Sequence, residues 1–187
     1  PHPNHVRTKY PTVLYLGRLK KYKRVDLLLH AVSKLIQEGS RVTLKIAGTG
    51  DDRGRLESLC TKLGIGNEVE FMGYVSEERK LELFQTCWLH ALTSSKEGWG
   101  ISCIESSACG TPTVASDSPG LRESVVSGET GLLVPHGDED RLTTAIGSLL
   151  TDRQAREEMG RRARRFAEGY SWDRSARAME DFLTRQT

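Results

Sequence analysis

The sequence lacks any apolar run long enough to cross a membrane. Its longest apolar stretches, such as residues 42–48, have the length of a strand, whereas a membrane-spanning helix needs about 20 apolar residues. The chain opens with PHPNHVRTKYP, which has the character of a linker and not of a signal peptide. We therefore expect a cytoplasmic domain without a membrane span of its own. Peripheral association with a membrane through another part of the protein stays open.

An excess of charge of one sign is also absent. The 27 Lys and Arg residues are balanced by 25 Asp and Glu residues, and a net charge of +2 is too small to indicate a nucleic-acid partner. The four cysteines form no C-x-x-C pair, and no histidine cluster completes a zinc site. Three of them lie in apolar or helical patterns, so we expect buried free thiols and a reducing compartment.

What the sequence does contain is a regular alternation of strand-like and helix-like patterns. Strands are expected at residues 11–17, 41–48, 69–73, 88–94, 111–117 and 131–135. Helices are expected at about 25–39, around 56–63, from the capping pattern SEER at Ser76 through Phe84, at about 100–109, near 121–126, and over most of the remaining chain. This alternation predicts an α/β fold, a doubly wound, Rossmann-like parallel six-stranded sheet with helices on both faces.

The commonest strand order for such a sheet, 3-2-1-4-5-6, places a topological switch between the first and fourth strands. Ligands bind there, outside the carboxyl ends of the strands. In this sequence those ends are GRLKKYKR after the first strand and SSKEGWG after the fourth, and both are rich in glycine and charge. Topology and composition therefore indicate the same crevice.

The segment EGWGISCIE has the composition of an anion site. Gly98 and Gly100 flank Trp99 at a strand–helix junction, where free backbone N–H groups attract an anion such as a diphosphate. Glu97 precedes this turn, and Glu105 follows it roughly 8 Å along the helix. Two carboxylates beside a diphosphate could accept hydrogen bonds from the hexose and ribose hydroxyls of a sugar nucleotide. The alternative is an ordinary turn, with both glutamates on solvated surface.

The segment GRLKKYKRVD is a second candidate. Gly17 frees the turn after the first strand, and Arg18 and Lys23 stand five residues apart near the start of a helix. An arginine fork and a lysine point charge could together stabilise a diphosphate. Because further basic residues crowd the same stretch, a solvated basic loop is the alternative.

The GTG stretch with the two acids after it, and the histidines, have simpler interpretations than a binding or catalytic site. The GTG at residues 48–50 resembles part of a dinucleotide fingerprint, but its third glycine is misplaced. We interpret Asp51 and Asp52, which follow it, as acids that cap the next helix, and we predict no metal site. His90 is interpreted as a packed residue of the fourth strand, and no histidine receives a catalytic role, including His2 and His5 of the linker.

Five stretches occur in an order that resembles a known family. They are GRLKKYKRVDLLLHA, IAGTGDDRGRLESL, VEFMGYVSEER, EGWGISCIESSACGTPTVASD and GLLVPHGD. Together they resemble the C-terminal, donor-binding domain of GT-B retaining glycosyltransferases of the group 1 / family 4 type, from Pro11 to Trp172. The resemblance implies a hexosyltransferase that uses a nucleoside-diphosphate sugar and needs neither a cofactor nor a metal.

The resemblance also implies roles for individual residues. Arg18 and Lys23, which follow Gly17, match the pair that holds the donor diphosphate and stabilises the leaving group. Glu97 matches the glutamate at the donor sugar, and Glu105 matches the one that accepts the ribose hydroxyls. The remaining donor-binding positions line the sugar and phosphate (Gly98, Trp99, Gly100 and Ile101) or the nucleotide base (Tyr74 and Val75). The implied catalytic set is Glu97, Arg18 and Lys23.

The sequence departs from the family pattern at two places. Phenylalanine is more usual at the position of Trp99, and Ser118, Pro119 and Gly120 stand where many members have a Gly-Gly turn, so the role of that loop is open. GT-B enzymes have two facing domains, and the resemblance implies that the acceptor-binding N-terminal domain is missing here. Residues 1–10 would then be a linker, residues 11–151 the donor-binding domain and residues 152–187 C-terminal helices.

Such a chain should bind a nucleotide sugar but should not complete a transfer alone. Two other classes stay open. One is another GT-B-like enzyme, a sugar-nucleotide epimerase or a phosphorylase. The other is a non-catalytic nucleotide-binding module.

Overall fold

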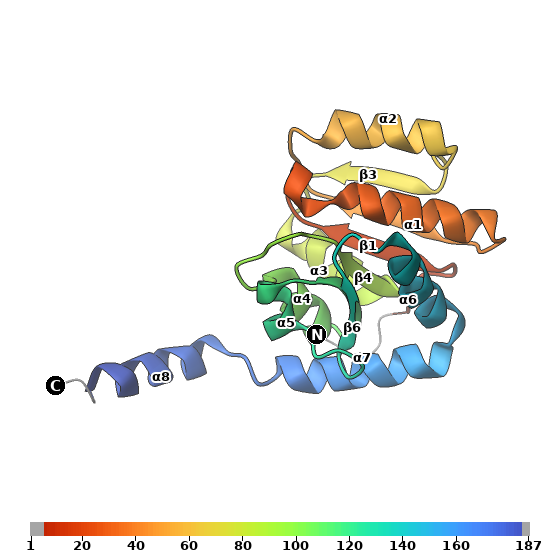
Figure 1. The fold of residues 1–187 in the computed structure, drawn as a ribbon. Helices are drawn as coiled ribbons and strands as arrows, with labels where there is room; N and C mark the ends of the chain where they lie inside the picture. Colours follow the sequence, from red (N-terminus) through yellow and green to blue (C-terminus); the bar gives the residue numbers. More distant parts are fainter. Residues whose placement is uncertain (1–5, 185–187) are drawn as a thin grey trace.

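The structure, a computed structural model, describes residues 6–184, without the side chains of residues 172, 175 and 178. His2 and His5, with the rest of residues 1–5, lie outside the described part. A parallel six-stranded sheet in the order β3-β2-β1-β4-β5-β6 forms its centre (Figure 1). Its strands are β1 (Thr12–Leu16), β2 (Thr43–Ala47), β3 (Val69–Gly73), β4 (Leu89–Leu92), β5 (Thr113–Asp117) and β6 (Gly131–Pro135). The predicted sheet and strand order are confirmed.

The helices occupy the predicted intervals. They are α1 (Val25–Gln37), α2 (Arg53–Leu63), α3 (Glu77–Thr86), α4 (Ile101–Ala108), α5 (Pro119–Ser124), α6 (Glu139–Thr151), α7 (Arg153–Ala167) and α8 (Trp172–Thr184). Ser76 caps α3 as predicted, because its hydroxyl accepts a hydrogen bond from the Arg79 amide. The helix α5 begins two residues earlier than predicted, since Pro119 occupies a first-turn position that proline favours.

Apolar side chains cover both faces of the sheet. Val13 and Tyr15 of β1 belong to a large buried cluster with α1, α2 and α6, whereas Leu14 belongs to a second cluster with α3. A strand buried on both faces has a continuous apolar sequence, which explains TVLYL in β1. His90 is fully buried in β4 against Phe84, so the predicted packing role is confirmed.

The cysteines are free thiols. Cys60, Cys87 and Cys103 are buried, and Cys109 is half-buried, in agreement with the prediction. Within residues 6–184, no helix combines the length and the apolar character that crossing a membrane requires.

The prediction that Asp51 and Asp52 cap α2 is wrong in its hydrogen bonds. Asp52 stands at the N-cap position, but its carboxylate makes no cap bond and instead binds the Arg55 guanidinium at 2.7 Å. Asp51 binds the Lys20 ammonium at 2.9 Å, and this hydrogen bond lowers the pKa of Asp51. The carboxylates that were predicted to bind helix amides therefore bind the side chains of Lys20 and Arg55.

The GTG stretch has a packing role. A Cβ atom at Gly48 would lie 1.9 Å from the carbonyl oxygen of Gly17, and Gly48 also has a φ of +139°. Only glycine allows the loop after β2 to lie this close to the loop after β1. The GTG stretch therefore packs directly against the loop that follows β1.

Residues 6–8 are fixed to the amino ends of β4 and β5. The Arg7 guanidinium donates to the carbonyl oxygen of Gly110 at 2.8 Å and to the Thr111 hydroxyl. The Trp88 indole donates to the carbonyl oxygen of Thr8 at 2.9 Å, and the Thr8 amide donates to the carbonyl oxygen of Thr86 at 2.9 Å. We call residues 6–8 the N-terminal strap. It lies at the opposite end of the strands from the predicted crevice.

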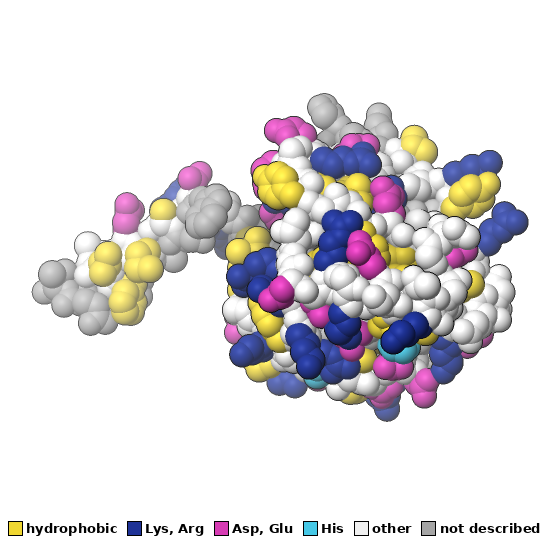
Figure 2. Space-filling model, turned by 90° about the horizontal axis from the view of Figure 1, so that it is seen from above, with side chains coloured by type: hydrophobic (Ala, Val, Ile, Leu, Met, Phe, Trp, Pro, Cys, Tyr) yellow, Lys and Arg dark blue, Asp and Glu magenta, His cyan; other side chains and the backbone are white. Residues whose placement is uncertain are grey.

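The last helix, α8, projects from the rest of the molecule beyond the end of α7 (Figure 1). Apolar side chains lie exposed along it (Figure 2), and Met179, Phe182 and Leu183 are each about 60% exposed. In the described part of the chain, this is the largest group of exposed apolar side chains on one element.

Candidate functional site

The loops after β1 and β4 meet at the topological switch and enclose a hollow of about 550 Å³, which we call the crevice. Its walls come from the end of β1, from Lys23, from the end of β4 and from the turn into α4. The lining residues are Leu16, Gly17, Lys23, Leu92, Glu97, Gly98, Trp99, Gly100, Ile101, Ser102 and Glu105. Eight of the predicted site residues therefore surround one hollow.

A buried ion pair forms the floor of this crevice. The Lys23 ammonium contacts Oε1 of Glu97, and the two side chains are only 10% and 14% exposed. Ser94, at the end of β4, donates its hydroxyl to the same Oε1 atom at 2.6 Å. Two predicted catalytic residues that lie 74 positions apart in sequence are thus in direct contact.

The backbone of the first loop is anchored to β4. The Thr93 hydroxyl donates to the carbonyl oxygens of Lys23 at 3.1 Å and Arg24 at 2.8 Å. Arg24 has a left-handed conformation with φ of 50°, which separates the short 3₁₀ helix η1 (Lys21–Lys23) from α1. These hydrogen bonds hold the backbone of Lys23 next to the residue that follows β4.

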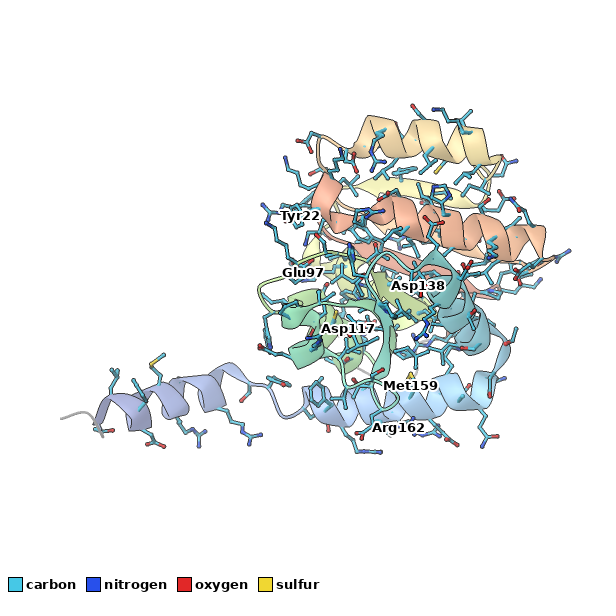
Figure 3. The ribbon with its side chains drawn as sticks, in the orientation of Figure 1. Tyr22, Glu97, Asp117, Asp138, Met159 and Arg162 are labelled. Carbon is cyan, nitrogen blue, oxygen red and sulfur yellow. The ribbon has the colours of Figure 1, made fainter. Side chains whose placement is uncertain are left out.

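Tyr22 connects the two loops at the rim of the crevice, on the same side of the molecule as Glu97 (Figure 3). Its carbonyl oxygen accepts hydrogen bonds from the amide and hydroxyl of Ser95. Its ring lies near the Lys23 and Lys96 ammonium groups, at 5.3 and 5.9 Å from the ring centre. Our sequence reasoning missed Tyr22, although an aromatic residue within a basic stretch was a usable signal.

The start of α4 supplies backbone donors. Gly100 occupies the N-cap position without a side-chain cap bond. The Cys103 amide donates to the carbonyl oxygen of Gly100 at 2.8 Å, and the amides that precede it have no partner within the helix. These amides and the helix dipole favour an anion at this end. Trp99 lines the crevice and packs its ring edge-on against Tyr170, with ring centres 5.2 Å apart.

Glu105 lines the far wall of the crevice, where Lys80 of α3 binds its carboxylate at 2.6 Å. The same ammonium binds Glu77 at 2.6 Å. Burial works against the charge of Lys80, but the hydrogen bonds to Glu105 and Glu77 outweigh it, and the pKa of Lys80 is raised. A ligand hydroxyl that reaches Glu105 therefore meets a carboxylate that is already held in place.

Ser118, Pro119 and Gly120, whose role the sequence left open, form the start of α5 and pack against the backbone of Glu97. A Cβ atom at Gly120 would lie 2.2 Å from the carbonyl oxygen of Glu97. This close approach requires glycine at that position. Sequence reasoning missed the contact because the two residues are distant in the chain.

Three predicted site residues do not line the crevice. Arg18 is exposed beside it, where its guanidinium donates to the Tyr22 hydroxyl at 3.2 Å. Tyr74 and Val75 follow β3 at the edge of the sheet, and Tyr74 is 83% exposed, whereas Val75 packs against the α3 cluster. Their assignment to the diphosphate and the base stays a prediction.

Comparisons with known proteins bear on this arrangement. A D-inositol 3-phosphate glycosyltransferase of Nocardia farcinica is 33% identical over 90% of this chain, and the chain spans 39% of its length. Among solved structures, a sucrose-phosphate synthase of Thermosynechococcus elongatus superposes with a TM-score of 0.87 at 31% identity, covering 95% of this chain and 45% of that one. HepE of Anabaena, solved in complex with UDP-glucose, gives 0.86 at 25% identity, with coverages of 95% and 49%.

The family model described as "Glycosyl transferases group 1" matches residues 2–166, which is most of the chain and includes both crevice loops. The Nocardia farcinica relative supports this match by its sequence, and the sucrose-phosphate synthase supports it by its fold. The chain therefore belongs to the glycosyl transferases group 1 family.

Proposed function

We propose that this chain is the donor-binding domain of a retaining glycosyltransferase that transfers a hexosyl group from a nucleoside-diphosphate sugar. The single observation that carries the proposal is the Lys23–Glu97 pair on the crevice floor, directly beside the first turn of α4. A cation and free amides suit a diphosphate, and a carboxylate suits sugar hydroxyls. The relative HepE, which shares this fold, was solved with UDP-glucose.

In this proposal, the protein stabilises the charge of the departing diphosphate. When the bond from the sugar to the diphosphate breaks, negative charge grows on the phosphate oxygens. Preoriented donors in a crevice shielded from water lower the barrier to such a step. Lys23 and the α4 amides would supply these donors from the floor, and Arg18 would supply a third by leaving Tyr22. Glu97 orients the hexose hydroxyls, and Glu105 accepts the ribose hydroxyls.

The acceptor would be bound by a second domain. The chain spans only 39% of the length of the Nocardia farcinica relative, so that protein has room for another domain of similar size. The exposed apolar side chains of α8 are suited to packing against such a domain. We therefore expect this chain alone to bind the donor and to leave it untransferred.

The test is a calorimetric titration of this chain with uridine, guanosine and adenosine diphosphates, each with and without a hexose. We expect saturable 1:1 binding of one nucleoside diphosphate and of its sugar derivative, with no product after prolonged incubation with simple acceptors. The bare nucleoside is the control, and it should bind more weakly because it lacks the phosphates. Absence of binding across the panel, or robust turnover by this chain alone, would contradict the proposal.

Binding should also be independent of metal. Asp51 and Asp52, the acids nearest to a metal-like pattern, are engaged by Lys20 and Arg55, and cationic side chains are present where a metal would otherwise neutralise the diphosphate. We expect the same dissociation constant in excess EDTA as in millimolar Mg²⁺ or Mn²⁺, measured by the same titration. Loss of binding in EDTA that either metal restores would show this expectation to be wrong.

A further inference from the structure

Ser94 is fully buried two residues after the end of β4, and its hydroxyl has one acceptor, the Oε1 atom of Glu97 at 2.6 Å. The Lys23 ammonium contacts the same atom. In the part of the chain that the structure describes, no protein group donates a hydrogen bond to the second oxygen, Oε2. Glu97 is thus held on one oxygen by two donors and keeps the other for a ligand.

The two donors are not equivalent when a diphosphate arrives. Lys23 lines the crevice and carries a mobile positive charge on a four-carbon stem, so a diphosphate competes with Glu97 for it. As Lys23 turns toward the phosphates, Glu97 loses the stronger of its two partners. The Ser94 hydroxyl cannot follow the ligand, because it is buried and attached to the last residues of a central strand.

We propose that Ser94 is the positioning residue that holds Glu97 in place once Lys23 has moved onto the donor diphosphate. Ser94 acts through Glu97 and touches neither the sugar nor the phosphates. This inference rests on the proposed function, because it assumes that a sugar diphosphate enters the crevice. It makes the recognition of the sugar by Glu97 depend on Ser94 and leaves the recognition of the diphosphate to Lys23.

The decisive experiment compares two affinities in each variant, one for the nucleoside diphosphate and one for its hexose derivative. Ser94→Ala should leave the affinity for the diphosphate within about twofold of wild type. It should weaken the sugar nucleotide by roughly fivefold to tenfold, which is less than the full factor for a hydrogen bond to a charged group, because Ser94 acts on the sugar only through Glu97. Ser94→Cys, which keeps the size but donates poorly, should behave like Ser94→Ala. Ser94→Thr, which keeps the hydroxyl, should lie closer to wild type.

A matched control and a double-mutant cycle separate positioning from folding. Ser106 is equally buried, and its hydroxyl donates to the carbonyl oxygen of Thr111 at 2.8 Å outside the crevice. Ser106→Ala removes a comparable hydrogen bond and should change neither affinity. In a Glu97→Ala background, Ser94→Ala should cause little additional loss, because both changes remove the same hydrogen bond.

The outcomes are distinguishable. If wild type binds no sugar nucleotide, the proposed function itself fails. If wild type binds and Ser94→Ala weakens both ligands equally, or weakens neither, the role of Ser94 is overturned while the proposed function stands. Additive losses from Ser94→Ala and Glu97→Ala would overturn it as well, because Ser94 would then act independently of Glu97.

Discussion

Replacing Lys23 with alanine should weaken binding of a nucleoside diphosphate by about 1.5–3 kcal/mol, the range for hydrogen bonds to charged groups. Lys23 is 8% exposed and lines the crevice, so its charge is little screened by water. The bare nucleoside should bind almost unchanged, because it lacks the phosphates that Lys23 contacts. Titration calorimetry with both ligands measures the difference directly.

The neighbouring cations provide graded comparisons. Lys21 is exposed in the same basic stretch and does not line the crevice, so Lys21→Ala removes the same charge and should cost only a small, salt-sensitive amount. Arg18→Ala should weaken diphosphate binding, because we expect the Arg18 guanidinium to leave Tyr22 and bind the phosphates. Equal losses for nucleoside and diphosphate in Lys23→Ala would mean that Lys23 acts through folding.

The free energy of unfolding should fall steeply between pH 6.5 and pH 4.5, by roughly 2.5 kcal/mol, because of His90 alone. Burial lowers the pKa of His90 to about 3 from its ordinary value of 6.5. Between these two values, the unfolded chain binds a proton that the folded chain excludes, so stability is full above pH 6.5 and is lost as the pH falls. Urea unfolding at a series of pH values measures this slope.

The matching variant is His90→Leu. It removes the titrating ring from the buried site between Phe84 and Thr113, and the pH slope in this window should flatten whatever the change in overall stability. An unchanged slope in His90→Leu would show that other groups control acid unfolding.

The alternation of strands and helices predicted this fold well because each element has a local signal. Buried strands such as β1 contain a continuous apolar run, VLYL, and helices such as α3 begin at a residue that caps them. The strand order came from the commonest topology, and the positions of the two crevice loops followed from it. Local patterns and a common topology were therefore sufficient to place Lys23 near Glu97.

The contacts that give the crevice its form were not predictable in the same way. The hydrogen bond from Ser94 to Glu97 and the close approach of Gly120 depend on side-chain direction and on residues distant in sequence. The helix-capping prediction failed at Asp51 for a related reason, because Lys20 from another loop binds that carboxylate. At Asp52 the competing cation is Arg55, which lies in the same helix. Such hydrogen bonds and close contacts depend on which residues are neighbours in space, and this cannot be read from a single sequence.

The N-terminal strap sets a rule for joining this domain to domains of other proteins. Arg7 supplies the donors for the carbonyl oxygens of Cys87 and Gly110, and Thr8 supplies the acceptor for the Trp88 indole. A chimera joined at residue 11, where β1 is about to begin, would discard these partners and leave polar groups at the base of the sheet unpaired. A junction upstream of Val6 would carry the strap with the domain and would place the sequence of the new partner beyond it.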